Sequence, residues 1–181
     1  MAKVIVFLAD GFEEIEALTV VDVLRRGEID VSTVSVMDKR TVCGSHKITV
    51  YADKMFDDIN FNEYDALVLP GGMGGTNNLM THEGVKEQIK TFVSAGKTVS
   101  AICAAPTVLG ASGVLKDKSA TCYPGCEDRL FAGEYTGDKV TVDGNIITGQ
   151  AMGSAIDFAL ELLARLGSIA ESDRVREAIV F

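Results

Sequence analysis

The sequence has few basic residues and no long hydrophobic run, and each shortage excludes a class of protein. Lys and Arg number 17 against 26 Asp and Glu. The net charge of −9 argues against nucleic acid or an anionic membrane surface as the main partner. No apolar stretch is long enough to cross a bilayer. The short apolar run near the N-terminus is followed at once by acidic residues, so we interpret it as a first strand, not a signal peptide, and expect a cytoplasmic protein.

Cysteine is also scarce, and the chain has only four, Cys43, Cys103, Cys122 and Cys126. A chain of 181 residues can bury a full core without disulfide bonds, so we expect free thiols in a reducing compartment. Cys122 and Cys126 have neither a second pair nor a nearby histidine, which is poor evidence for zinc. We therefore expect no metal site.

Strand-like and helix-like segments alternate along the whole chain, without repeats or a linker, so we predict one domain over residues 1–181. Buried strands are predicted at Lys3–Ala9, Val31–Val36, Asp65–Leu69 and Thr98–Ile102, with a short one at Ser119–Cys122. Hairpins are predicted at Thr41–Tyr51, where an edge excursion is the alternative, and at Val140–Thr148. Helices are predicted around Ala17–Gly27, Glu83–Ala95, Pro106–Gly113, Ala155–Leu166 and Glu171–Val180. This order indicates an α/β fold, a three-layer α/β/α sandwich around a mostly parallel sheet.

In such sheets the functional site lies beyond the carboxyl ends of the strands. Three loops fall there, at Asp10–Glu16, Pro70–Gly75 and Cys103–Ala105. Cys103 stands where an apolar strand runs directly into a helix, which is the pattern of a nucleophile elbow built on cysteine. The amides that begin such a helix favour a thiolate, so we expect the pKa of Cys103 to be lowered. A buried structural cysteine is an equally common explanation of this stretch alone.

The other two loops supply candidate partners for the cysteine. Gly71 and Gly72 follow a strand, and beside Cys103 their backbone amides could form an oxyanion hole, although a simple turn is the commoner meaning of Gly-Gly. Glu13 and Glu14 suit the start of a helix, where acidic side chains complement the helix dipole. Glu16 begins an apolar helix face, where burial would raise the pKa of its carboxyl and let it donate to a thiolate.

These segments carry a family resemblance. Gly-Phe-Glu-Glu-Ile-Glu-Ala, Leu-Pro-Gly-Gly and Ala-Ile-Cys-Ala-Ala-Pro occur in this order, and the chain resembles the ThiJ/PfpI superfamily over nearly its whole length. It looks most similar to the branch of the parkinsonism-associated deglycase and its bacterial relatives. The resemblance implies a flavodoxin-like sandwich, a homodimer, and no cofactor. It also implies a nucleophilic, oxidation-sensitive Cys103, a protonated Glu16, and an oxyanion site formed by the amides of Gly72 and Ala104.

The chain departs from the family pattern at several positions. Ala104 follows the cysteine, where the protease-like branch has histidine. Tyr123 precedes Pro124, where the deglycase branch often has histidine, and Gln150 stands where an arginine can occur. His46 matches a basic residue of the hairpin only roughly, and His82 fits the start of a helix. We keep Gly71, His46, Tyr123 and Gln150 as pocket candidates.

Three functions from different classes remain open. The first is a cofactor-independent cysteine enzyme that acts on reactive 2-oxoaldehydes or their adducts, of glyoxalase III or deglycase type. The second is a non-enzymatic redox sensor or chaperone that uses oxidation of Cys103. The third is a cysteine peptidase or amidase, which the missing downstream histidine disfavours.

Overall fold

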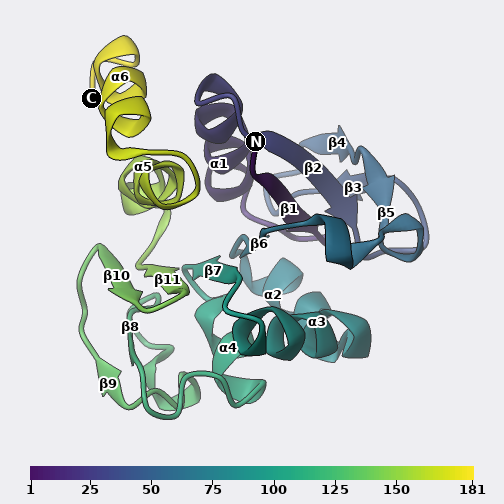
Figure 1. Cartoon of the computed structure of the whole chain (residues 1–181). Coiled ribbons are helices and arrows are strands. Elements are labelled where there is room, and N and C mark those ends of the chain that lie inside the picture. Colours follow the sequence, from purple (N-terminus) through teal and green to yellow (C-terminus); the bar gives the residue numbers. More distant parts are fainter.

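A seven-stranded sheet forms the centre of the molecule in a computed structural model that describes residues 1–181 (Figure 1). The strands of this sheet are β1 (Lys3–Leu8), β2 (Asp30–Ser35), β5 (Lys54–Met55), β6 (Ala66–Leu69), β7 (Thr98–Ile102), β10 (Val140–Asp143) and β11 (Ile146–Gly149). Their order is β10-β11-β7-β6-β1-β2-β5. All neighbours are parallel except β10 and β11, which form an antiparallel hairpin at one edge.

Helices cover both faces of the sheet, as the alternation of strands and helices predicts. They are α1 (Glu14–Arg26), α2 (Met73–Thr81), α3 (Glu83–Ser94), α4 (Pro106–Ala111), α5 (Ala155–Leu166) and α6 (Ile169–Ala178). Four short 3-10 helices lie at Phe56–Asp58, Phe61–Glu63, Glu127–Arg129 and Met152–Ser154. Helices α1, α5 and α6 share one core with one face of the sheet, and α2, α3 and α4 share a second core with the other face (Figure 1).

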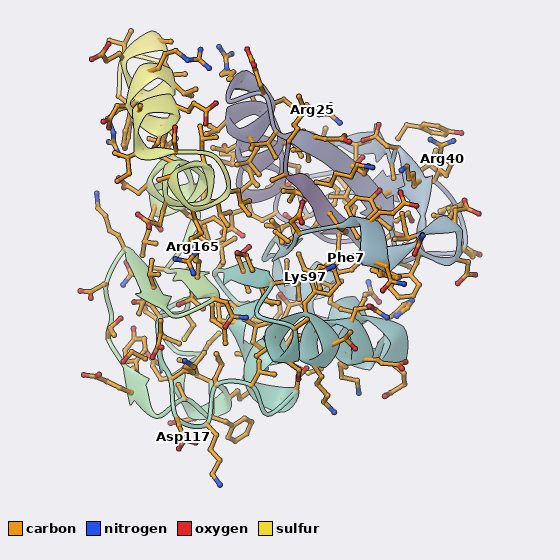
Figure 2. The ribbon with its side chains drawn as sticks, viewed as in Figure 1. Phe7, Arg25, Arg40, Lys97, Asp117 and Arg165 are labelled. Carbon is orange, nitrogen blue, oxygen red and sulfur yellow. The ribbon has the colours of Figure 1, made fainter.

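Successive side chains of β1 enter the two cores alternately, because strand side chains alternate between faces. Val4 and Val6 belong to the core under α1 and α5, whereas Ile5 and Phe7 belong to the core under α2–α4. Figure 2 shows Phe7 between the sheet and this second layer of helices. The three-layer α/β/α sandwich of flavodoxin-like type is therefore confirmed.

Two small sheets lie outside the central one. β3 (Thr41–Cys43) and β4 (Thr49–Tyr51) form the predicted hairpin. β8 (Ser119–Ala120) pairs with β9 (Glu134–Tyr135), which the sequence analysis did not predict. β8 is shorter than predicted and ends before Cys122, a buried residue outside any strand.

The main error of the sequence analysis concerns α2, which begins at Met73 inside a segment interpreted as loop. Its first turns are rich in glycine and asparagine, which have low helix propensity. Tertiary contact explains the helix: a Cβ atom on Gly75 would lie 2.8 Å from the Cα atom of Phe12, so only glycine permits this approach. No helix in the structure has the length and apolar composition that a membrane span requires.

Candidate active site

Cys103 lies at the turn between β7 and α4, with a φ angle of +66°. This left-handed conformation costs a non-glycine residue on the order of 1–3 kcal/mol, so neighbouring hydrogen bonds must hold it. The Cys103 amide donates to the Gly149 carbonyl at 2.9 Å, and the Cys103 carbonyl accepts from the Tyr123 amide at 2.7 Å. The side chain is half-buried. The predicted nucleophile elbow geometry is therefore present.

The Glu16 carboxyl reaches the same point from the first turn of α1. The residue has no exposed surface, and its Oε2 accepts from the Gly71 amide at 2.9 Å. Its Oε1 is buried without a hydrogen-bond partner, and its Oε2 lies on the same side of Gly71 as the Cβ atom of Cys103. The structure thus brings together the two residues that the sequence analysis singled out from loops far apart in the chain.

Gly71 and Gly72 allow this approach because neither carries a side chain. A Cβ atom on Gly71 would lie 2.5 Å from Glu16 Oε2 and 2.6 Å from the Cβ atom of Cys103. Gly72 has a φ angle of +83°, and a Cβ atom there would lie 2.4 Å from the carbonyl oxygen of Gly11. Both contacts are shorter than real Cβ atoms tolerate, so glycine is required at both positions.

Burial dominates the electrostatics of the pair. It raises the pKa of Glu16 to about 7, and the nearby negative charge of Glu13 acts in the same direction. The pKa of the Cys103 thiol is raised to about 12. Burial is the largest cause, and the charge and hydrogen bond of Glu16 act in the same direction. The lowered thiol pKa expected from the sequence is therefore wrong for the state in which Glu16 is ionised. The helix amides alone do not outweigh burial beside a carboxylate.

Backbone amides favour the anion of Cys103 all the same. The Gly72 and Ala104 amides act on the sulfur and lower its pKa. These are the two amides assigned to the oxyanion site in the sequence analysis. When Glu16 carries the proton its charge is absent, and these amides still act on the sulfur.

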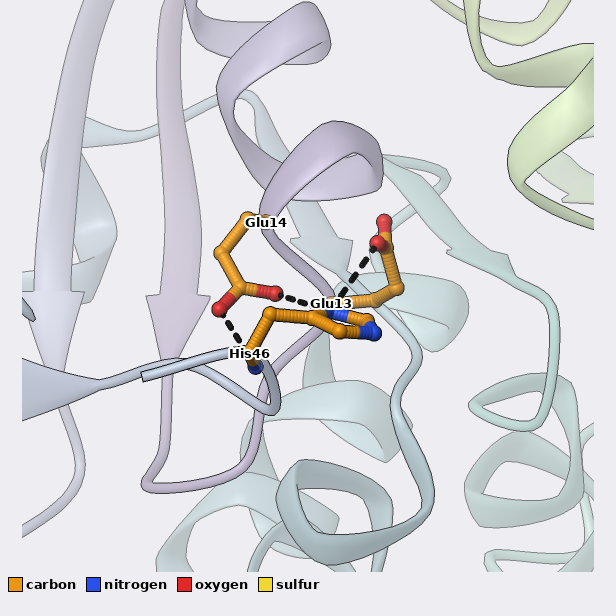
Figure 3. A group of neighbouring side chains, drawn as sticks. All are labelled: Glu13, Glu14 and His46. Carbon is orange, nitrogen blue, oxygen red and sulfur yellow. Dashed lines mark hydrogen bonds and ion pairs between the residues drawn. The ribbon is translucent and has the colours of Figure 1, made fainter. Parts of the chain in front are cut away.

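His46 lies at the turn of the β3–β4 hairpin, beside Glu13 and Glu14 at the start of α1 (Figure 3). Its Nδ1 lies 2.9 Å from Glu14 Oε2, and its amide donates to Glu14 Oε1 at 2.7 Å. This contact raises the pKa of His46 and lowers that of Glu14 to about 2, despite the opposing effect of burial on Glu14. His46 thus anchors the hairpin to α1 and makes no hydrogen bond to Cys103.

A cavity of about 270 Å³ lies at this place. Its lining residues are Glu13, Glu14, Ile15, His46, Ile48 and Met152. The ligand atoms of Glu13, Glu14 and His46 lie within 4.8 Å of one another, which makes them the one group in the structure that could hold a metal ion. Of these residues only His46 was a pocket candidate from the sequence, because the apolar lining residues Ile15, Ile48 and Met152 are far apart in the chain and form no local pattern.

The structure also places the other residues singled out from the sequence, Tyr123, Gln150 and His82. Tyr123 supplies a backbone hydrogen bond to Cys103, and its side chain is half-exposed. Gln150 follows Gly149, but its side chain amide donates to the carbonyl of Gly137 at 2.8 Å. His82 caps α3, where its Nδ1 accepts from the Val85 amide, as its place in the sequence indicates.

Comparison with known proteins agrees with this geometry. The Parkinson disease protein 7 homolog of Danio rerio is 33% identical over 98% of this chain and 96% of its own length. A protein named deglycase from Pyrococcus abyssi is 32% identical over 91% of this chain and 99% of its own length. Protein DJ-1 homolog B of Arabidopsis thaliana is 35% identical over 90% of this chain, which spans only 37% of that longer relative.

Solved structures of related proteins have the same fold as this chain. An alanine mutant of a DJ-1 superfamily protein from Salmonella typhimurium superimposes with a TM-score of 0.95, at 38% identity, over 100% of this chain and 99% of that one. An oxidised DJ-1 from Toxoplasma gondii gives a TM-score of 0.95 at 34% identity, over 100% and 99% of the two chains. The model of the DJ-1/PfpI family matches residues 2–165. The chain therefore belongs to the DJ-1/PfpI family.

Proposed function

We propose that this protein is a cysteine enzyme that converts reactive 2-oxoaldehydes, or their adducts, into hydroxy acids without a cofactor. The observation that carries the proposal is the buried Glu16 carboxyl facing a half-buried Cys103 at a strained turn. A carboxyl with a pKa of about 7 can both give and take a proton at neutral pH, as general acid–base catalysis requires.

The chemistry follows from these groups. The Cys103 sulfur attacks the aldehyde carbon of methylglyoxal, and the carbonyl oxygen becomes the hydroxyl of a hemithioacetal. The amides of Gly72 and Ala104 stabilise the developing oxyanion. Glu16 removes the proton from the former aldehyde carbon and returns it to the neighbouring carbon, while the hydroxyl proton of the hemithioacetal passes to the neighbouring oxygen, which yields a thioester of lactate. Water then hydrolyses the thioester, releasing lactate and the free thiol.

The name of one relative supports the broader class of enzymes that act on aldehydes and their adducts. The Pyrococcus abyssi protein is named deglycase, and deglycation applies the same carbon chemistry to an aldehyde already attached to a thiol or amine. An enzyme of this kind needs no imidazole, because the adduct at the aldehyde carbon is resolved by a proton shift and hydrolysis.

The test is lactate formation from methylglyoxal in metal-free buffer. We expect turnover by the unsubstituted protein and none by Cys103→Ser or Glu16→Gln, with Cys43→Ser as the control cysteine. Glu16→Gln retains a hydrogen-bond donor but cannot shuttle protons. Turnover by Glu16→Gln at the unsubstituted rate would refute the general acid–base role.

A redox sensor or chaperone is the second candidate, and the Glu16 carboxyl favours it specifically. Its Oε1 is buried without a hydrogen-bond partner and the Cys103 side chain acts on the carboxyl, so a protonated Glu16 can donate to an oxygen added to the sulfur. A related structure is described as oxidised. Stoichiometric modification of Cys103 without steady-state lactate formation would favour this function over the enzyme.

A cysteine peptidase or amidase is the third candidate and has the least support. It needs an imidazole beside the sulfur, and the two histidines are engaged with Glu14 and Val85. We expect the double variant His46→Ala, His82→Ala to retain methylglyoxal turnover, with no casein cleavage by either protein. Loss of both activities with the fold intact would restore the peptidase interpretation.

A further inference from the structure

Two carboxylates and an imidazole meet where the β3–β4 hairpin contacts the start of α1 (Figure 3). The Nδ1 atom of His46 lies 2.9 Å from Glu14 Oε2 and 4.0 Å from Glu13 Oε1. The ligand atoms of the three residues all lie within 4.8 Å of one another. Nitrogen and oxygen atoms bound to one zinc ion at about 2.0–2.2 Å are separated from each other by about 3–4 Å. Small side-chain rotations would therefore bring all three atoms onto a single ion.

A backbone amide holds one oxygen of each carboxylate and leaves the other oxygen on the side of the imidazole. Glu13 Oε2 accepts from the Glu16 amide at 2.8 Å, and Glu14 Oε1 accepts from the His46 amide at 2.7 Å. The Ser45 hydroxyl adds a hydrogen bond to Glu14 Oε2 at 3.1 Å. Hydrogen bonds of this kind fix the orientation of the side chains that bind metals. Both carboxylates are therefore already oriented as ligands.

The charge of these buried carboxylates is not balanced within the chain. Glu13 and Glu14 are only 9% and 4% exposed. Both have His46 as their ion-pair partner, and neither forms an ion pair with a lysine or arginine. Glu13 Oε1 accepts no hydrogen bond, since the amide of Glu16 donates to Oε2. Buried charges are costly unless they are paired or coordinate a metal, so a divalent cation fits this place.

The cavity of about 270 Å³ gives this cluster an open side. Apart from the three polar residues, its lining consists of Ile15, Ile48 and Met152. The side chain of His46 is 72% exposed, so an ion can reach the ring from solvent. Zinc sites with three protein ligands keep a fourth position for water or an external ligand, and the cavity provides the space for one.

We propose that Glu13, Glu14 and His46 form a binding site for a divalent transition-metal ion, for which zinc is the probe. Zinc accepts imidazole nitrogen together with carboxylate oxygen, whereas magnesium and calcium prefer oxygen ligands alone. His46 binds through Nδ1 as the neutral imidazole, so the ion lies where the ring and Glu14 now share a hydrogen bond. The site goes beyond the proposed function, because the aldehyde chemistry assigned to Cys103 and Glu16 is routed through no metal.

The sequence carried no pattern for this site. Glu14 and His46 are 32 residues apart in the chain, and they meet only because the hairpin folds back onto α1. The expectation of no metal site was based on Cys122 and Cys126, which take no part in the cluster. A bound ion ties the hairpin to the helix more firmly than the hydrogen bonds alone.

The experiment is a titration of the metal-free protein with Zn²⁺ in competition with a chromogenic chelator, in buffer without added thiol. We expect one zinc ion per chain. His46→Ala and Glu13→Gln each remove one of the three ligands, and we expect zinc to bind each at least about tenfold more weakly, since loss of an outer hydrogen bond alone costs about 10–100-fold. His82→Ala is the matched control, because this histidine caps α3, and it should bind zinc as the unsubstituted protein does.

Thiolates also bind zinc, so a cysteine variant distinguishes the cluster from the Cys103 sulfur. We expect Cys103→Ser to bind zinc with the affinity of the unsubstituted protein. Cobalt(II) serves as a second probe, because nitrogen and oxygen ligands give visible bands without the intense near-ultraviolet band of thiolate ligation. We expect visible bands alone, and their loss in His46→Ala.

Three results would overturn the proposal: no zinc binding at all, equal affinity in the folded His46→Ala variant, or binding that is lost in Cys103→Ser and kept in His46→Ala. Circular dichroism checks the fold of each variant, and Glu13→Gln decides the question if His46→Ala does not fold. The measurement uses no aldehyde. Failure of lactate formation therefore counts against the proposed function and leaves the metal site to be decided by the zinc titration.

Discussion

At the scale of single residues, the environment of Cys103 contains backbone dipoles and one carboxyl but no positive side chain. The Gly72 and Ala104 amides favour the thiolate, while burial and an ionised Glu16 oppose it. The reactivity of the sulfur therefore depends on the protonation state of a single neighbour. This differs from a cysteine activated by an adjacent imidazolium, whose thiolate persists over a wide pH range.

Peroxide should oxidise Cys103 before the other cysteines. Cys122 and Cys126 are 0% and 3% exposed, and the thiol of the half-buried Cys43 donates to the Gly44 carbonyl and lies at no strand-to-helix turn. We expect sulfenic and then sulfinic acid at Cys103, because its sulfur is only half-buried and the Gly72 and Ala104 amides favour its anion. Peptide mass mapping after mild peroxide treatment checks this. Earlier modification of another cysteine would contradict the nucleophile assignment.

Glu16 should make stability fall with rising pH in a definite window. Its pKa rises from 4.5 to about 7 on folding, so the native state holds more protons than the unfolded state between these values. Stability is then fully present below pH 4.5 and is lost as pH rises to about 7, by about 3 kcal/mol. We expect Glu16→Gln to flatten this part of the profile in urea unfolding measured at a series of pH values.

Glu14→Gln is the matched control for that measurement. Folding lowers the pKa of Glu14 to about 2, so its contribution is present above pH 4.5 and is lost as pH falls toward 2. The two substitutions should therefore flatten opposite limbs of the profile. If Glu16→Gln left the slope between pH 4.5 and 7 unchanged, the carboxyl would not be protonated as the structure implies.

At the scale of elements, the start of α1 is held by two other parts of the chain. The β3–β4 hairpin contacts it through the Cys43 amide, which donates to Asp10 Oδ1 at 2.8 Å, and through the Ser45 amide, which donates to the Phe12 carbonyl at 2.8 Å. The β6–α2 turn contacts it through Gly71 and Gly75. The site thus forms where the ends of β1, β6 and β7 meet, as expected for a parallel sheet.

Gly71→Ala should disrupt the site more than the fold. The added methyl group would meet both Glu16 Oε2 and the Cβ atom of Cys103, so one of them must move. We expect a loss of about 1–3 kcal/mol in unfolding free energy and a larger relative loss of lactate formation. Gly153→Ala is the control, because a Cβ atom there meets nothing within 4 Å. Unchanged turnover in Gly71→Ala would show that the approach of the two residues is not needed.

At the scale of the whole molecule, four of the exposed apolar residues lie on α1 or at the cavity beside its first turn. Ile15, Ile48 and Met152 are 49%, 53% and 48% exposed and line one cavity, and Leu18 on α1 is 38% exposed. The turn of the β3–β4 hairpin is bonded to the first turn of α1 through His46 and Glu14, so these residues lie on one surface. Exposed apolar residues gathered in this way are typical of an interaction surface.

We predict that the chain forms a two-fold homodimer through this surface. Sedimentation at micromolar concentration should give twice the chain mass of 19.3 kDa. Ile48→Glu would place a charge in the interface and should shift the protein toward the monomer. Val142→Glu changes an equally exposed apolar residue at the opposite edge of the sheet and should not. A protein that sediments at the chain mass throughout would refute the prediction.

The sequence by itself determined the class of fold and the two residues of the candidate site. Apolar periodicity and glycine or proline boundaries are local properties, so they predicted β1, β2, β6, β7, the β10–β11 hairpin and the elbow at Cys103, but not the short edge strand β5. The apolar neighbours of Glu16 indicated its burial, which the structure confirms at 0% exposure. These features follow from residues close together in the chain.

Only the tertiary structure decided the rest. Helix α2 exists because glycine allows its backbone to contact residues 11–12, which outweighs low local propensity. The raised pKa of Cys103 depends on burial and on a carboxyl from α1, neither of which the elbow segment contains. The same holds for the contact between His46 and Glu14, since electrostatic effects depend on distances in space and not along the chain.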